Sequence, residues 1–124
     1  MDVLKHLVER YVALWNEPDP ERRRAGIAAV WSPDAAHFTP SKEVHGHAEL
    51  EIRIADAYAR FVGTGQYVFR HCDNITGHHD TVKFNWQMVP PGGGPIAAFG
   101  FDFLVLDGEG RILRDCQYIE PTPA

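Results

Sequence analysis

The sequence predicts one α+β domain, in which three helices come first and a mostly antiparallel sheet of long strands follows. Apolar residues recur at spacings of three and four through the first half of the chain, as they do along one face of a helix. From Gln66 onward the period changes to two, which is typical of strands with one buried face. A chain of 124 residues, 44% of them hydrophobic, suits one core, so we expect a single domain over residues 1–124.

Each predicted helix ends at residues that stop a helix. The first covers residues 4–15 and ends at Pro18 and Pro20, because proline lacks the backbone donor that a helix needs. The second covers residues 21–31 and ends before Pro33. The third opens at Gly46 and ends at the glycine-rich residues 63–65. Its expected apolar set is Leu50, Ile52, Ile54, Ala55, Tyr58, Phe61 and Val62.

A short strand at residues 35–39 precedes the third helix, and longer strands follow that helix. The longer ones cover residues 67–75, 81–89, 99–106 and 112–119. The last two form a hairpin, since the glycine-rich residues 107–110 between them are typical of a tight turn. In residues 81–89 the apolar side chains, expected on the buried face, are Val82, Phe84, Trp86 and Met88. The polar ones, expected on the other face, are Lys83, Asn85 and Gln87.

Charge and composition exclude several classes of partner. The formal net charge of -5 argues against nucleic acid and against an anionic membrane, since both need a basic face. No apolar run approaches the roughly 20 residues that span a bilayer, and the first residues lack a signal peptide, so we expect a cytoplasmic protein. Neither Cys72 and Cys116 nor the histidine pairs at residues 45 and 47 and at 78 and 79 have metal-ligand spacing, so no metal is expected.

Asp102 is the most informative polar residue. It stands between Phe101 and Phe103 on a predicted strand, where a charge is costly unless it is paired, solvated or protonated. Two interpretations stay open at this point. Asp102 either faces solvent from a half-exposed strand or is a functional carboxyl group in the interior.

The order helix, helix, short strand, helix and four strands resembles the nuclear transport factor 2-like fold, also described as a cystatin-like α+β barrel. Polyketide cyclases of the SnoaL type and ketosteroid isomerases belong to this group. The short sequence features that carry this resemblance are residues 9–14, residues 33–35, Gly46, and Asp102 and Phe103 ahead of residues 107–112. The resemblance implies a cone-shaped, curved, mostly antiparallel sheet wrapped around three N-terminal helices, with a pocket at the open end and no cofactor.

The resemblance to ketosteroid isomerases also implies candidate catalytic residues. Tyr11 and Asp102 match the tyrosine and the protonated carboxylic acid that polarise a substrate carbonyl. The carboxylate that moves the proton would fall at Thr39, which cannot act as a base. Two histidines are alternatives: His37, on the same face of its strand as Thr39, and His71, in a segment similar to a strand of scytalone dehydratase-like members. A structural role stays open for each histidine.

Further residues are expected to line the pocket. Asp115 and Gln117 share a face of the last strand and would line the cavity by alignment with the isomerases. The aromatic residues favour a flat or cyclic apolar ligand, and they are Trp15, Phe38, Tyr58, Phe84, Trp86 and Phe99.

Two functions follow from these residues. The first is a cofactor-independent isomerase, cyclase or dehydratase that acts on an apolar cyclic carbonyl compound. The second is a non-catalytic domain that binds a ligand or dimerises. In either case we expect a homodimer through the convex sheet face, which Val68 or Phe69 and residues 96–98 would make apolar.

Overall fold

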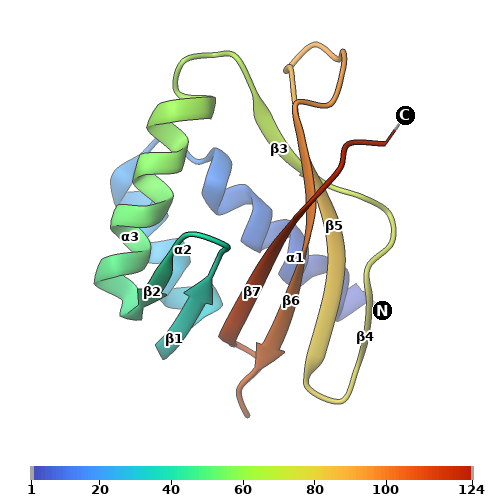
Figure 1. Ribbon diagram of the computed structural model, residues 1–124. Helices are drawn as coiled ribbons and strands as arrows, with labels where there is room; N and C mark the ends of the chain where they lie inside the picture. The colour runs from blue at the N-terminus through green and yellow to red at the C-terminus, as the bar shows by residue number, and fades with distance from the viewer. Residues whose placement is uncertain (1, 124) are drawn as a thin grey trace.

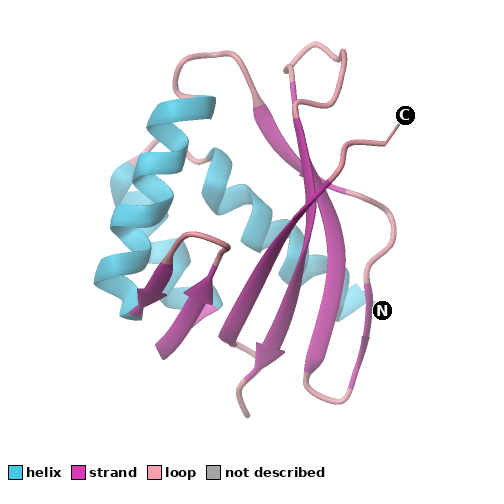
Figure 2. Ribbon diagram, in the orientation of Figure 1, coloured by secondary structure: helices cyan, strands magenta, loops and turns pink. Residues whose placement is uncertain are grey.

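The computed structural model describes residues 2–123, and within them three α-helices pack against one face of an open, curved sheet of seven strands (Figure 1, Figure 2). The helices are α1 (Asp2–Asn16), α2 (Pro20–Val30) and α3 (Gly46–Ala57), and α3 continues into a π-helical turn, η1 (Tyr58–Val62). The strands of the first half are β1 (Trp31–Phe38) and β2 (Glu43–His45). Those of the second half are β3 (Val68–His71), β4 (Thr76–His78), β5 (Thr81–Val89), β6 (Ala98–Leu106) and β7 (Ile112–Glu120). The predicted fold class is confirmed.

The strand order is β2-β1-β7-β6-β5-β3, with β4 paired to the edge of β5. Every neighbouring pair is antiparallel except β1 and β7, which run parallel. The register places His37 of β1 opposite Asp115 of β7, and Asp102 of β6 opposite Gln117 of β7. Since side chains of directly opposed residues lie on the same face, these four point toward the helices.

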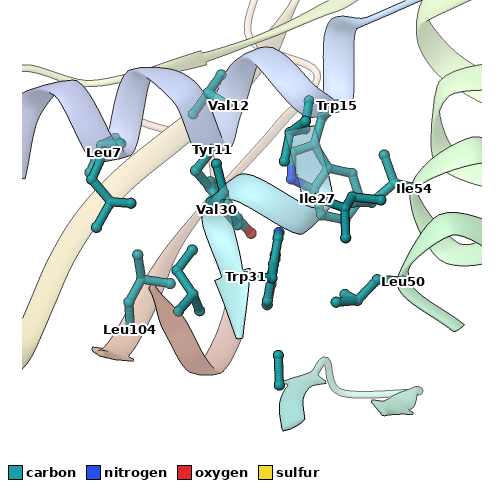
Figure 3. Close-up of a cluster of buried hydrophobic side chains, with 14 of the residues drawn as sticks. Leu7, Tyr11, Val12, Trp15, Ile27, Val30, Trp31, Leu50, Ile54 and Leu104 are labelled. Atoms are coloured by element: carbon teal, nitrogen blue, oxygen red, sulfur yellow. The ribbon is translucent and has the colours of Figure 1, made fainter. Parts of the chain in front are cut away.

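The core lies between α1 and the concave face of the sheet (Figure 3). The predicted spacing of α1 is confirmed, because Leu7, Val8, Tyr11, Val12, Leu14 and Trp15 are all buried. From the sheet, the apolar residues of β5 that were expected to face inward are buried as well: Val82, Phe84, Trp86 and Met88. Except for Met88, the residues of these two stripes belong to one apolar cluster, which buried residues of α2, α3, β1, β2, β6 and β7 complete.

The first strand is longer than expected, because Trp31 begins β1 rather than ending the second helix. Pro33 stops the helix as predicted, but the extended backbone that a proline favours in the residue before it also suits a strand. The β1–β7 register shifts between Trp31 and Ala36, so Pro33 falls in the irregular part of the ladder, where a missing donor is tolerated.

Helix α3 turns a different face inward from the one expected. Ile52 is 71% exposed, whereas Leu50, Ile54 and Ala57 are buried. Since residues three and four apart share a helix face, the position between Leu50 and Ile54 on this face belongs to Arg53. The expectation that Ile52 is part of the core was wrong.

The face of the sheet turned away from the helices differs in part from the expectation, since of the two alternatives on β3 only Val68, which alternates with Phe69, is left for this face. Phe69 packs inward, with ring centroids 6.3 Å from those of both Trp15 and Trp86, and Ala98 lies against the core. The aromatic residues of the outer face are instead Phe101, Phe103 and Tyr118, together with Phe99, which was expected to face a ligand but lies opposite Gln87. The Phe101 and Tyr118 rings stack 4.7 Å apart.

Asn85 lies on this outer face as predicted, yet it is only 9% exposed. Its side-chain amide donates to the carbonyl of Gly100 and to Glu120, and its carbonyl oxygen accepts from Asn74. These hydrogen bonds satisfy the polar groups of a buried amide.

None of the helices within residues 2–123 combines the length and the apolar character that crossing a membrane requires.

Candidate functional site

A cavity of about 200 Å³ lies between α1, α3 and the concave face of the sheet. Most of its wall is apolar, and its aromatic lining comes from Trp15, Phe61, Phe69 and Trp86. Ile119, an exposed residue at the end of β7, also contributes to the lining. The cavity therefore offers an aromatic surface to a small apolar molecule.

The polar groups of the cavity are close together. Apart from the indole N–H groups of Trp15 and Trp86, the polar side chains among the described lining residues are Tyr11, Arg53, Asp102 and Gln117. Asp102 and Gln117 are opposed on neighbouring strands, the Tyr11 hydroxyl lies 2.9 Å from Asp102 Oδ2, and Arg53 Nη2 lies 3.4 Å from Gln117 Oε1. The cavity thus has one polar end, where a ligand oxygen would be recognised.

Tyr11 joins two carboxyl groups. Its hydroxyl oxygen lies 2.9 Å from Asp102 Oδ2 and 2.6 Å from Asp115 Oδ2. A phenol has one proton and can donate only one full hydrogen bond, so the other contact needs a proton on a carboxyl group. One of the two aspartates is therefore a carboxylic acid that donates to the Tyr11 oxygen.

The other contacts of Asp115 identify it as the ionised partner. His37 Nδ1 lies 2.9 Å from Asp115 Oδ2, and Arg53 Nε–H points to His37 Nε2 at 3.4 Å. Because Nε2 accepts from Arg53, the histidine proton is on Nδ1 and is donated to Asp115. Asp115 Oδ2 then receives two donors, so Asp115 is the carboxylate and Asp102 is the acid.

Burial accounts for the protonation states of this cluster. It raises the pKa of Asp102 well above its usual range, and the charge of Asp115 raises it further. Burial also raises the pKa of Asp115, but the hydrogen bonds from Asp102 and Tyr11 and the charge of Arg53 oppose this rise. The pKa of Tyr11 is raised well above its usual value by burial and by both carboxyl groups, so the phenol stays protonated.

His37 is neutral near physiological pH. Burial, followed by the charge of Arg53, lowers its pKa to about 4. The contact between His37 and Asp115 is therefore a hydrogen bond from a neutral imidazole rather than an ion pair. Its role is to hold Asp115 in place and to stabilise the carboxylate.

His37, Asp102 and Asp115 place their polar atoms within 4.8 Å of one another, and these residue types ligate metal ions. Both nitrogens of His37 are already hydrogen-bonded, however, and the Arg53 guanidinium stands next to the ring. A lone pair free for a metal is therefore lacking on His37 as the cluster is arranged. The cluster fits a proton network better than a metal site.

The structure brings some of the predicted site residues to the cavity wall and places others behind it. On the wall are Tyr11, Trp15, Trp86, Asp102 and Gln117. Behind it, fully buried, are His37, Phe84 and Asp115. His37 does not reach the cavity because it lies in the core near Trp15 and Trp31, with ring centroids 5.7 and 6.0 Å away.

Three predicted site residues are outside the lining, and each has other contacts. Thr39 accepts a hydrogen bond from the backbone of Ser41. The ring of Tyr58 lies 5.0 Å from the Arg23 guanidinium carbon. His71 Nδ1 contacts the carbonyl oxygen of Cys72 at 3.0 Å. None of the three described side chains is positioned to serve as a base in this cavity.

Arg53 is the charged residue of the cavity wall that the sequence analysis did not predict. Arg53 stands between Ile52 and Ile54, and both of these residues were assigned to the buried face, which left Arg53 on the exposed face. A charged residue three positions after Leu50 and four before Ala57 lies on the helix face that these residues bury. Choosing the helix phase from Leu50, Ile54 and Ala57 would have placed Arg53 facing the sheet.

Comparison with known proteins agrees with the architecture. The profile of the SnoaL-like domain matches residues 8–114. A candidate isomerase of the SnoaL-like family from Agrobacterium tumefaciens is 28% identical, covers 98% of this chain and 100% of its own, and superposes with a TM-score of 0.88. No curated protein matches the chain in sequence.

Two more distant solved structures share the fold. A candidate polyketide cyclase from Sinorhizobium meliloti is 15% identical, with 90% of this chain and 93% of its own covered and a TM-score of 0.69. A candidate hydroxylase, AclR from Streptomyces galilaeus, is 21% identical, with 97% and 90% covered and a TM-score of 0.66. At these identities the similarity concerns the fold.

Proposed function

Since this chain belongs to the SnoaL-like domain family, we propose that it binds a small, mostly apolar cyclic compound and uses Asp102 as a general acid on an oxygen of that compound. The reaction would be a cofactor-independent isomerisation, cyclisation or dehydration. The observation that carries this proposal is the Tyr11 hydroxyl held between Asp102 and Asp115. That arrangement keeps one carboxyl group protonated at the polar end of an otherwise apolar cavity.

The size of the cavity supports a ligand with about one ring. An apolar cavity of roughly 150 Å³ accepts benzene, so the cavity of about 200 Å³ has room for a six-membered ring with a short polar substituent. Trp15, Phe69 and Trp86 provide aromatic surface for such a ring. A larger ligand would extend past Ile119 toward solvent.

Tyr11 can support proton transfer from Asp102 without leaving its place. While Asp102 is protonated, Tyr11 donates to Asp115, its shorter contact at 2.6 Å. When the Asp102 proton turns from the Tyr11 oxygen toward the cavity and passes to a ligand oxygen, the Tyr11 proton can turn to the new carboxylate 2.9 Å away. The hydroxyl then stabilises the Asp102 carboxylate while Asp115 keeps the hydrogen bond from His37, which lowers the cost of moving the proton.

A second function, binding without turnover, is favoured by a different observation. Most enzymes that isomerise a carbonyl compound need a base as well as an acid. Neither His37 nor His71 lines the cavity. Among the lining residues that the structure describes, only Asp102 has a carboxyl group. A protein with this cavity could hold a ligand through Asp102 without abstracting a proton.

Hydrogen exchange into a bound ketone distinguishes the two functions. We would add 2-cyclohexenone and 3-cyclohexenone in D₂O and follow deuterium incorporation and double-bond migration by NMR. The enzyme function predicts exchange that Asp102→Asn slows at least tenfold, while the control Asp34→Asn, at an exposed position, leaves the rate unchanged. Binding without exchange supports the second function, and absence of binding in the cavity contradicts both.

A further inference from the structure

The guanidinium of Arg53 is the feature of the cavity that the proposed acid chemistry does not use. It lies on the cavity wall, with its central carbon 5.1 Å from the ring of Trp15. Its hydrogen bonds to His37 and Gln117, both long at 3.4 Å, engage only two of the five N–H donors of a guanidinium. Within the part of the chain that the structure describes, no carboxylate forms an ion pair with it. A partly buried cation on a cavity wall is thus left with unused donors.

The groups beside Arg53 are also hydrogen-bond donors. Gln117 uses its carbonyl oxygen toward Arg53, which leaves its side-chain NH₂ for a ligand. Asp102 has one proton, which it donates to the Tyr11 oxygen, so it becomes a donor to a ligand only when that proton turns toward the cavity. A ligand that satisfies Arg53 and Gln117 must therefore bring several acceptor lone pairs to this end of the cavity.

We propose that the ligand is a monocarboxylic acid whose carboxylate binds Arg53 and Gln117, with its apolar ring against Trp15 and Trp86. This inference names the substrate class of the proposed function and rests on it. A planar guanidinium matches a carboxylate in shape and charge, and the pair gains strength where water is excluded. Among the described lining residues, Arg53 alone has a cationic side chain. The cavity therefore suits a ligand with one negative charge rather than a polyanion.

The carboxylate would lie beside the acid. Gln117 and Asp102 are opposed on β7 and β6, so a group bound to the Gln117 amide is within a few ångströms of the Asp102 carboxyl. The oxygen that Asp102 protonates is then close to the carboxylate in the ligand itself. Oxo acids and hydroxy acids with a ring have this arrangement.

Benzoate and benzamide test the inference, because they share one ring and nearly one shape but differ by one charge. Both would be titrated at neutral pH, with tryptophan fluorescence as the signal and amide NMR shifts to locate them in the cavity. We expect the wild-type protein to bind benzoate roughly tenfold more tightly than benzamide, through charge-assisted hydrogen bonds. Arg53→Gln should remove this preference by weakening benzoate alone.

Two further variants keep the test decisive. Arg60→Gln removes the same charge from the exposed η1 turn, where Arg60 lies 3.8 Å from Asp56, and should leave the preference intact. Arg53→Lys keeps the charge without the planar fork and should retain part of the preference, which settles the matter if Arg53→Gln does not fold.

The failure of this inference is distinct from that of the proposed function. Equal affinities of the wild-type protein for both compounds, or the same loss in Arg60→Gln as in Arg53→Gln, would overturn the carboxylate site while leaving the cavity as a binding site. If neither compound shifts the cavity residues at millimolar concentration, this inference fails, and the binding of the cyclohexenones decides separately whether the proposed function fails with it.

Discussion

The hydroxyl oxygen of Tyr11 lies 2.9 Å from Oδ2 of Asp102, although the two residues are 91 positions apart in the chain. The same oxygen lies 2.6 Å from Asp115 Oδ2. Two carboxyl groups that share one phenol cannot both be ionised at low cost in a buried site. The stability and the chemistry of this domain therefore depend on where one proton is located.

Asp102→Asn should make the protein less sensitive to rising pH. The folded-state pKa of Asp102 lies above its unfolded value of about 3.9, so in the wild type the free energy of unfolding falls as pH rises above that value, until Asp102 ionises in the folded state. The loss from this group is at most about 1.4 kcal/mol per pH unit. Asparagine can still donate to Tyr11 but does not titrate.

Urea unfolding of Asp102→Asn and of the wild type between pH 4 and pH 8 measures this difference, which should grow with pH. Asp34→Asn, at an exposed position, serves as the control. If carboxyl NMR finds Asp102 ionised at pH 5 in the free protein, the assignment of the proton to Asp102 is wrong.

His37→Asn should protect the protein against mild acid. The pKa of His37 is lowered to about 4 in the folded state, so the unfolded chain binds a proton first as pH falls below about 6.5. The wild type therefore loses stability between those two values, by up to about 3 kcal/mol from this residue. Asparagine keeps a donor for Asp115 and removes the titration.

The measurement is the free energy of unfolding at several pH values in this window, with the exposed His45 changed to asparagine as the control. A titration of His37 near or above the ordinary histidine value, seen in its ring carbon signals, would contradict the neutral imidazole and favour an ion pair with Asp115.

Tyr11→Phe should destabilise the fold by about 1 to 3 kcal/mol, because it leaves buried carboxyl oxygens without the hydroxyl that both contact. The ring itself is kept, so the contacts with Trp31 and Phe84 are preserved. Thermal or urea unfolding gives the value, and Tyr118→Phe removes an exposed hydroxyl as the control. An unchanged stability would mean that the bridge contributes little.

A homodimer through the outer face of the sheet stays a prediction, and the structure changes the residues on which it depends. Phe103 is 37% exposed and Tyr118 is 52% exposed, and Tyr118 stacks on Phe101. Exposed aromatic residues on a helix-free sheet face favour self-association. Tyr118→Glu should shift sedimentation toward the monomer. Ile52→Glu, which places the same charge at an exposed apolar residue of α3, should not. A wild-type protein that sediments as a monomer at micromolar concentration would contradict the prediction.

Local patterns in the sequence determined the fold class and the direction of most side chains. The spacing of three and four in α1 and the alternation in β5 follow from the geometry of a helix and of a strand, which act over a few residues. The cost of a charge between Phe101 and Phe103 likewise made Asp102 a candidate before its surroundings were known. Tyr11 and Gln117 were expected in the cavity on the family resemblance and line it.

Only the tertiary structure decided how these residues act together. The parallel pairing of β1 with β7 sets His37 opposite Asp115. Helix α1 crosses the sheet (Figure 1), and this crossing brings Tyr11 between two carboxyl groups. Such pairings depend on strand order and register across long stretches of chain, which no local period encodes. The inward orientation of Arg53 also depends on tertiary packing, because α3 packs with Leu50 and Ile54 buried and with Ile52 exposed to solvent.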